Sequence, residues 1–326
     1  LFTLLNCYGM KVSSIISTLG ASLGTLLPML GIAILGLVWI ISGQPIATNQ
    51  PISWLPDFSQ FGNVSIFLAV LFGLLGMEMS AVHAEEVKNP QRDYPRALLY
   101  STIVIFLSLV LGSLAIITVL PNNTLSVVSG LIDAYAIFFD AYHLAWLTPI
   151  LACLIVLGAV SGISAWMIGP TKGLLVAAHD GCIPERFTKT NRHGAPTTIL
   201  ITQAIIFTLL TSLFVCFKTI NAAYWMLSDM CAQMALLVYV LMFAAAIKLR
   251  YSNPKQRGAY RIPGGFLGIW TVAGAGLLCC IGTILRGFVP PTQVPIKNIF
   301  LFESFLVGGL ILFTIMPWFL TRKNIR

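Results

Sequence analysis

Eight long apolar stretches, separated by short turn-rich loops, constrain this chain more than any other feature. About 20 consecutive apolar residues cross a bilayer as an α-helix. The stretches that meet this test lie at approximately 22–41, 61–82, 97–120, 144–169, 196–217, 222–247, 266–289 and 299–320. Only 9% of the 326 residues are charged, against about 25% in soluble domains. The sequence therefore predicts an all-α integral membrane protein with a single transmembrane domain over residues 1–326.

The basic residues predict how these spans are oriented. Sixteen of the nineteen Lys and Arg residues fall in alternate loops and in the C-terminal tail, and the opposite loops hold only Lys218, Arg286 and Lys297. Cytoplasmic loops carry such an excess of positive charge. We therefore expect a multi-pass protein of the cell (inner) membrane with a cytoplasmic C-terminus. Because the charges alternate between spans, they do not predict nucleic acid as a partner.

The span at 61–82 carries the pattern that most favours a function. Gly73 and Gly76 interrupt it, and Glu78 follows the interruption. Non-helical backbone at bilayer depth is tolerated where it lines a cavity, and many transporters build their binding sites from broken helices. An ionised side chain there costs about 2.5–3.5 kcal/mol on insertion scales. We predict a binding site at this break, with Glu78 carrying a proton or tuning charge; the alternative is a kinked core helix with an inert Glu78.

Other polar groups give weaker signals. Small residues around 158–165 let a helix or a ligand approach closely, and helix packing is the commoner reason for such a run. The apolar stripe Leu174–Ala178 predicts a short amphipathic helix along the cytoplasmic interface. Asp229 lies about two turns into its span and could face a vestibule, whereas Glu303 is expected at an interface. Neither the seven cysteines nor the histidines have metal-site or catalytic spacing, so we expect no metal, no cofactor and no enzyme activity.

Three segments resemble the amino acid–polyamine–organocation (APC) permease family. They read GMEMSAVHAEEVKNPQRDYPRAL, IGPTKGLLVAAHDGCIPERFTKTNRHGAP and YRIPGG, and their order suits that family over nearly the whole chain. The resemblance implies the leucine-transporter-like inverted-repeat fold, with the eight spans as helices 5–12 and residues 1–9 as the end of helix 4. Because the spans would begin at the end of helix 4, we interpret the chain as N-terminally truncated. The resemblance implies that the missing helices include one and three, which normally supply much of the site.

The resemblance also implies a substrate and a set of site residues. GMEMSAVH is similar to the corresponding segment of bacterial glutamate/γ-aminobutyrate antiporters, and this resemblance implies a secondary active amino acid transporter that works as an antiporter. Those antiporters tend to carry a glutamate where Gly162 aligns, so other amino acids remain open. Glu78 falls on the acidic residue of the family motif. The expected substrate-binding residues are Phe72 as an aromatic gate, Gly73, Leu74 and Gly76 at the break, Ser161, Gly162, Ser164 and Trp166 as the facing wall, and Tyr239 as a hydroxyl from helix ten.

An alternative of another class stays open at this point. A truncated membrane protein or gene remnant that does not transport would show the same spans. The partners expected from the sequence are the lipid bilayer and a small amino acid, and the sequence leaves monomer and homodimer undecided.

Overall fold

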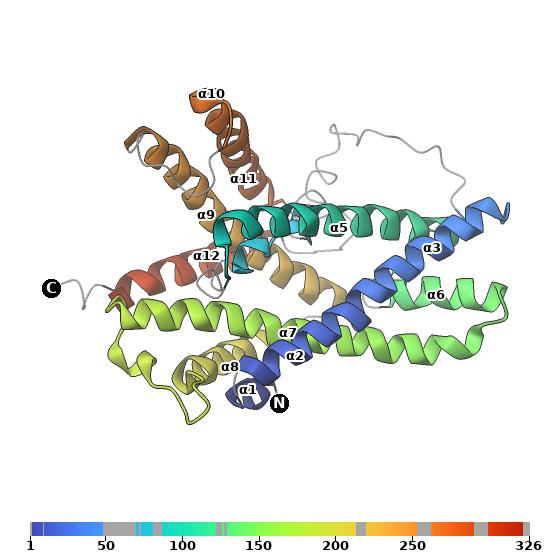
Figure 1. The fold of residues 1–326 in the computed structure, drawn as a ribbon, viewed down its shortest axis with the longest axis horizontal. Coiled ribbons are helices and arrows are strands. Elements are labelled where there is room, and N and C mark those ends of the chain that lie inside the picture. The colour runs from blue at the N-terminus through green and yellow to red at the C-terminus, as the bar shows by residue number, and fades with distance from the viewer. Residues whose placement is uncertain are drawn as a thin grey trace.

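The structure is a computed structural model that describes residues 2–8, 10–47, 70–71, 73–80, 87–121, 126, 129–212, 220–252, 262–289 and 299–321. Within these residues all regular secondary structure is helical (Figure 1). In chain order the elements are α1 (Phe2–Cys7), α2 (Met10–Ala21), η1 (Ser22–Leu26), α3 (Leu27–Ile41), α5 (Pro90–Val119), α6 (Gly130–Ala141), η4 (Ala145–Leu147), α7 (Thr148–His179), η5 (Glu185–Thr188), α8 (Thr197–Ser212), α9 (Ile220–Ser252), α10 (Gly265–Ile269), η7 (Trp270–Gly274), α11 (Ala275–Arg286) and α12 (Ile299–Thr321).

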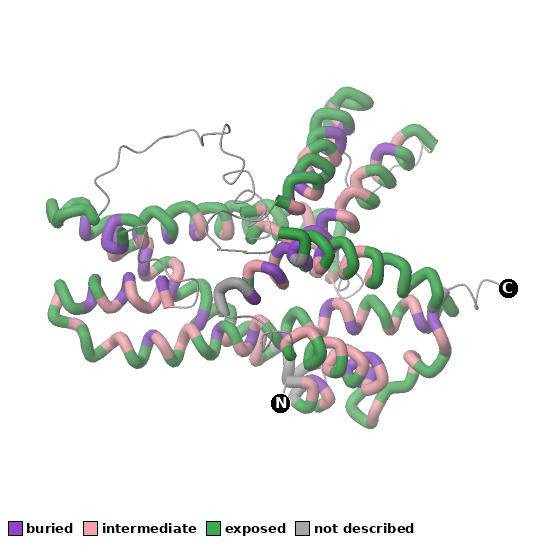
Figure 2. Tube along the Cα trace, turned by 180° about the vertical axis from the view of Figure 1, so that it is seen from behind, coloured by how far each residue is buried: buried purple, intermediate pink, exposed green. Residues whose placement is uncertain are grey.

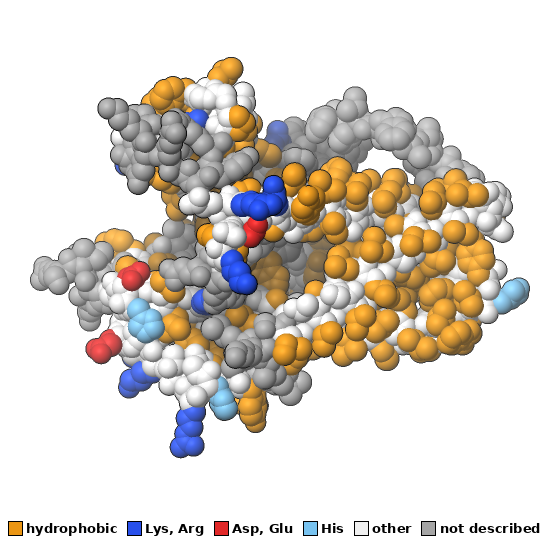
Figure 3. Space-filling view, in the orientation of Figure 1, with side chains coloured by type: hydrophobic (Ala, Val, Ile, Leu, Met, Phe, Trp, Pro, Cys, Tyr) orange, Lys and Arg blue, Asp and Glu red, His pale blue; other side chains and the backbone are white. Residues whose placement is uncertain are grey.

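Six of the helical stretches are long and apolar enough to cross a membrane. They are Ile15–Ile41, Pro90–Val119, Ala145–His179, Ala223–Ser252, Gly265–Arg286 and Phe302–Phe319. Their outward faces carry exposed Leu, Ile, Val and Phe side chains, and hydrophobic side chains cover the right half of the molecule in Figure 3. Such surfaces are stable only in lipid. The chain is therefore a multi-pass integral membrane protein. Most of the expected span at 61–82 lies outside the described residues.

The helices form two packed groups. In the first, α3, α5, α6 and α7 share a buried cluster that includes Trp39, Tyr135 and Phe138. In the second, α9 packs against α11 through Leu236 and Cys280 and against α12 through other buried side chains. Figure 1 shows α10, α11 and the C-terminal part of α9 rising to one side of α5. Buried residues follow the inner faces of the helices, as Figure 2 shows.

Helix α6 lies between the expected spans at 97–120 and 144–169, where the sequence predicts only a connection. Residues Leu131, Tyr135, Phe138 and Phe139 recur at helical spacing, and the last three are buried against the first helix group. The Tyr135 hydroxyl donates a hydrogen bond to the Pro28 carbonyl oxygen at 2.5 Å. At 12 residues, α6 is too short to cross a bilayer, so a search for apolar stretches of about 20 residues does not detect it.

Helix α7 continues beyond its expected end. The expectation of a separate amphipathic helix at Leu174–Ala178 is wrong, because these residues form the last turns of α7, which ends at His179. Pro170 lies within the helix without ending it. The Thr171 hydroxyl lies 2.6 Å from the Met167 carbonyl oxygen and 2.8 Å from Gln203 Oε1 on α8. The contact with Gln203 ties this part of α7 to α8.

Candidate functional site

The chain leaves the helix at the break that the sequence indicated. Residues 73–74 are helical, Leu75 and Gly76 form a turn, and 77–80 form a 3₁₀ turn. Gly76 has φ +108°, and a Cβ atom there would lie 2.8 Å from the Trp166 ring. Both the backbone conformation and the close approach therefore require glycine at this position. Gly73, in contrast, is exposed and helical, and a Cβ there would meet nothing closer than Leu109 at 3.8 Å.

Glu78 joins the broken segment to α9. Its Oε2 atom accepts a hydrogen bond from the Gly76 backbone N–H at 3.0 Å. The Tyr239 hydroxyl, 161 residues further along the chain, donates to the same oxygen. Hydrogen bonds to a charged carboxylate are stronger than neutral ones. The carboxylate thus accepts from a backbone donor at the break and from the Tyr239 hydroxyl of α9.

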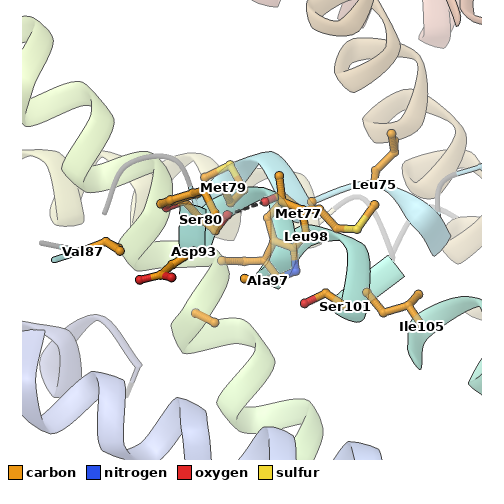
Figure 4. Close-up of a pocket in the computed structure, with 14 residues that line it drawn as sticks. Leu75, Met77, Met79, Ser80, Val87, Asp93, Ala97, Leu98, Ser101 and Ile105 are labelled. Carbon is orange, nitrogen blue, oxygen red and sulfur yellow. Dashed lines mark hydrogen bonds between the residues drawn. The ribbon is translucent and has the colours of Figure 1, made fainter. Parts of the chain in front are cut away.

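A cavity of about 640 Å³ lies beside the break (Figure 4). It is formed by the 75–80 segment, Val87, the first half of α5, and Ala165 and Trp166 of α7. Apolar side chains provide most of its surface. The lining residues are Leu75, Gly76, Met77, Met79, Ser80, Val87, Asp93, Tyr94, Ala97, Leu98, Ser101, Ile105, Ala165 and Trp166. The Tyr94 hydroxyl donates to the Ser80 carbonyl oxygen, and Thr102 Oγ1 lies 3.3 Å from Met77 Sδ. Helix α5 is thereby tied to the unwound segment.

Helix α7 presents one face to the break and another to its neighbours. Gly162, Trp166 and Gly169 share a face at helical spacing. Trp166 lines the cavity, and a Cβ on Gly169 would lie 2.6 Å from Met79 Cε. Outside its own helix backbone, none of the described residues has an atom within 4 Å of the position that a Gly162 Cβ would take. Of the two predicted site residues on this face of α7, Trp166 lines the cavity and Gly162 is not among its lining residues.

Ser161 and Ser164 lie on the other face of α7, away from the cavity. Ser161 is 2% exposed, donates to the Gly158 carbonyl oxygen at 2.8 Å, and contacts Gly20 of α2. Ser164 donates to Asn6 Oδ1 of α1 at 3.0 Å. Both serines thus serve the close packing that the sequence analysis named as the commoner reason for small residues. Their expected place in the cavity wall does not match the cavity lining.

The remaining predicted residues fall in three positions. Tyr239 is at the site through Glu78. Gly73 and Leu74 precede the turn and are not among the cavity-lining residues. Phe72 lies outside the described residues. Tyr94 and Ala165 line the cavity and Gly169 packs against Met79, and none of the three was predicted as a site residue. Gly169 could have been found, because it follows Gly162 by seven residues and so shares its helix face.

The side chains that could ligate a metal do not gather into a site among the described residues. No cluster of three or more His, Cys, Asp or Glu side chains occurs in the part of the chain that the structure describes. Glu303, near the start of α12, is exposed, and Asp229 of α9 is buried. The chemistry that the described residues can offer at the break is therefore hydrogen bonding, apolar contact and the carboxylate of Glu78.

Comparison with known proteins gives concordant results. The model of the family described as "Amino acid permease" matches residues 1–312. An uncharacterized transporter of Legionella pneumophila is 62% identical over 99% of this chain and 70% of its own length. A glutamate/γ-aminobutyrate antiporter of Lactococcus lactis is 28% identical over 92% of this chain and 60% of its own. A putrescine transporter of Haemophilus influenzae is 26% identical over 89% and 68%.

The chain thus spans about 60–70% of the length of these curated relatives. The family match covers nearly all of the described helices, including the broken segment and the residues around its cavity. Sequence motifs, membrane-spanning helices and family match agree, and the chain belongs to the amino acid permease family.

Proposed function

We propose that this permease is a secondary active transporter of the cell membrane that exchanges amino acids by alternating access around the break at Leu75 and Gly76. One observation carries the proposal: within the span expected at 61–82, the described residues leave the α-helix at Leu75 and Gly76, beside a cavity of about 640 Å³. A helix break of this kind leaves backbone donors and acceptors without helical partners at bilayer depth, where a polar solute can bind them. The antiporters among the relatives support exchange as the mode of transport.

Glu78 supplies a way to couple charge to binding. In its ionised form the carboxylate holds both the Gly76 N–H and the Tyr239 hydroxyl. These two donors are also suited to a substrate carboxylate. A proton on Glu78 weakens its hold on them, and the donors then become available to the substrate. Proton uptake and substrate binding would favour each other through this shared pair of donors.

The cavity also limits the class of substrate. Its lining is largely apolar, Asp93 is its acidic member, and no Lys, Arg or His is among the lining residues that the structure describes. The lining fits the apolar part of an amino acid, with the charged groups held at the break. Glutamate and γ-aminobutyrate are the substrates named for two relatives, so both belong in the test. The chain covers only 60% of those proteins, so neither substrate is assigned to it.

The direct test is exchange in proteoliposomes made with the whole reading frame that encodes this chain. Vesicles loaded with one unlabelled amino acid are tested for uptake of labelled glutamate, γ-aminobutyrate, leucine and putrescine. We expect uptake of at least one amino acid that depends on an amino acid inside the vesicle. If no substrate is exchanged by correctly folded protein, the proposal fails and the non-transporting membrane protein is favoured.

The role of Glu78 is tested separately with Glu78→Gln. The amide oxygen can still accept from Gly76 and Tyr239, but the side chain cannot carry a proton. We expect transport that no longer responds to pH, or a large loss of rate. Glu303→Gln, at an exposed position of α12, is the matched control. An unchanged rate and pH dependence in Glu78→Gln would remove the proton role.

A further inference from the structure

Two buried polar side chains lie on one face of α9, apart from the break. Asp229 is 5% exposed and Gln233 is 0% exposed. They are four residues apart, which places them one turn from each other on the same face of the helix. Both lie within the apolar stretch Ala223–Ser252, and neither lines the 640 Å³ cavity. They are therefore a polar pair inside an apolar helix that the site at Glu78 does not use.

The pair has no hydrogen-bond partner among the described residues. Gln233 Nε2 and Oε1 are both buried and unsatisfied there, and no hydrogen bond to Asp229 occurs within the same part of the chain. Buried polar groups in proteins are nearly always hydrogen-bonded, and an unpaired buried carboxylate is especially costly. The residues around them on α9 and α12, such as Met226, Met230 and Phe302, are apolar. The pair thus requires either a ligand or each other.

The surrounding elements offer no counter-charge. Titratable or charged side chains on the helices packed against α9 are Cys279, Cys280 and Arg286 of α11 and Glu303 of α12. On α9 itself they are Tyr224, Cys231, Tyr239, Lys248, Arg250 and Tyr251. Arg286, Glu303 and Lys248 are exposed, and Arg250 donates to the carbonyl oxygens of Ile262 and Gly265. No described basic side chain therefore balances an ionised Asp229.

The donor and acceptor inventory selects a proton as the ligand. Gln233 has one unsatisfied donor group and one unsatisfied acceptor. A neutral carboxylic acid offers one O–H donor and one carbonyl acceptor, which match the amide at both atoms. An ionised carboxylate has no donor, so Oε1 of Gln233 would stay unpaired. A metal cation such as Ca²⁺ would need six or more oxygen ligands, which two side chains cannot supply.

We propose that Asp229 is a second proton-binding site of this permease, held neutral within the bilayer by a paired hydrogen bond with Gln233. The proton adds to the carboxylate oxygen, and a rotamer change brings the acid and the amide together. Tyr239, the partner of Glu78, lies ten residues further along α9, which is about 15 Å along the helix axis. The two carboxyls are therefore separate sites on one helix. This proposal does not depend on the proposed transport activity.

Infrared difference spectroscopy of the purified full-length protein tests the site without a transport assay. The spectrum of the Asp229→Asn variant is subtracted from that of the wild type at neutral pH. We expect a carbonyl band of a protonated carboxylic acid, sensitive to D₂O, which persists in Glu78→Gln. In Gln233→Leu that band should move to higher frequency, because the acid loses its amide partner. Carboxylate bands with no acid band would overturn the proposal.

A second measurement covers the case in which Asp229→Asn does not fold. Wild-type protein is prepared with aspartate labelled with ¹³C at the side-chain carboxyl, and its spectrum is compared with that of unlabelled protein. We expect an isotope-shifted carboxylic acid band at neutral pH. The other described aspartates, Asp93, Asp133, Asp140 and Asp180, are at least partly exposed, whereas Asp229 is buried. If no aspartic acid band shifts, Asp229 is ionised and the proposal is wrong.

Discussion

The Tyr239 hydroxyl and the Gly76 backbone N–H both donate to one oxygen of Glu78. The bond from the Tyr239 hydroxyl joins α9 to a segment 161 residues away in the sequence. Glu78 is thus held by the Gly76 N–H at the helix break and by the Tyr239 side chain of α9. Any motion of α9 relative to the break changes the environment of this carboxylate.

Removing the hydroxyl should therefore weaken the site. Tyr239→Phe keeps the ring, which contacts Phe243, but takes away one of the two donors to Glu78. A hydrogen bond to a charged group contributes about 1.5–3 kcal/mol, so we expect a roughly 10-fold to 100-fold loss in exchange rate. Tyr224→Phe, on the same helix and exposed, is the control and should leave the rate unchanged. Equal rates for both variants would show that the bond does not contribute to transport.

The glycine of the turn should tolerate no side chain. Gly76→Ala places a Cβ atom 2.8 Å from the Trp166 ring and requires φ +108° of a residue that disfavours it. The backbone alone costs about 1–2 kcal/mol, before any clash. We expect lost exchange and a lower melting temperature in detergent. Gly73→Ala, three residues earlier and helical, should fold and function as the wild type does.

A double-mutant cycle separates the two causes. Trp166→Ala removes the ring that the new Cβ would strike but leaves the backbone conformation unchanged. If the clash dominates, the double variant Gly76→Ala/Trp166→Ala should be close in stability to Trp166→Ala alone. If the backbone dominates, the two losses should add. Thermal unfolding of the four proteins gives the coupling energy.

The break itself was predictable from the sequence, whereas its exact wall was not. Glu78 stands out because a carboxylate is rare at bilayer depth, and Gly76 because non-helical backbone there is tolerated only where it is buried in protein or lines a cavity. The positions of Ser161 and Ser164 could not be read in the same way, because small residues serve helix packing and ligand contact alike. Only the rotation of α7 decides between them, and tertiary contacts with α1 and α2 set that rotation. Helix α6 was missed because it is short, not because its pattern is weak.

The close packing of η1 on α7 gives a prediction about stability. A Cβ on Gly24 would lie 2.3 Å from the Gly158 backbone nitrogen. Because backbone cannot move aside as a flexible side chain can, Gly24→Ala should destabilise the protein by about 1–3 kcal/mol or more. Gly282→Ala on α11 meets nothing within 4 Å among the described residues and should be neutral or slightly stabilising, since alanine favours helix. A variant Gly24→Ala that melts with the wild type would contradict this packing.

Two tyrosines at the α6 end of the molecule give a matched pair. Tyr135 donates to the Pro28 carbonyl oxygen, whereas the buried Tyr142 hydroxyl has no partner in the described part of the chain. Tyr135→Phe removes this hydrogen bond and should cost about 0.5–1.5 kcal/mol of unfolding free energy. Tyr142→Phe removes an unsatisfied group and should be neutral or stabilising. Equal unfolding free energies for the two variants would contradict the assignment.

Ionisation of Tyr135 should make the stability of the protein depend on pH in the alkaline range. Burial raises the pKa of Tyr135 above its usual value near 10. The folded protein then keeps the phenolic proton where the unfolded chain releases it, so the unfolded state binds fewer protons. Stability should therefore be fully retained below about pH 10 and fall as the pH rises above it, by about 1.4 kcal/mol per pH unit for this one group. Tyr135→Phe cannot ionise, so its unfolding free energy should fall less steeply over that range, as measured by denaturant unfolding in detergent.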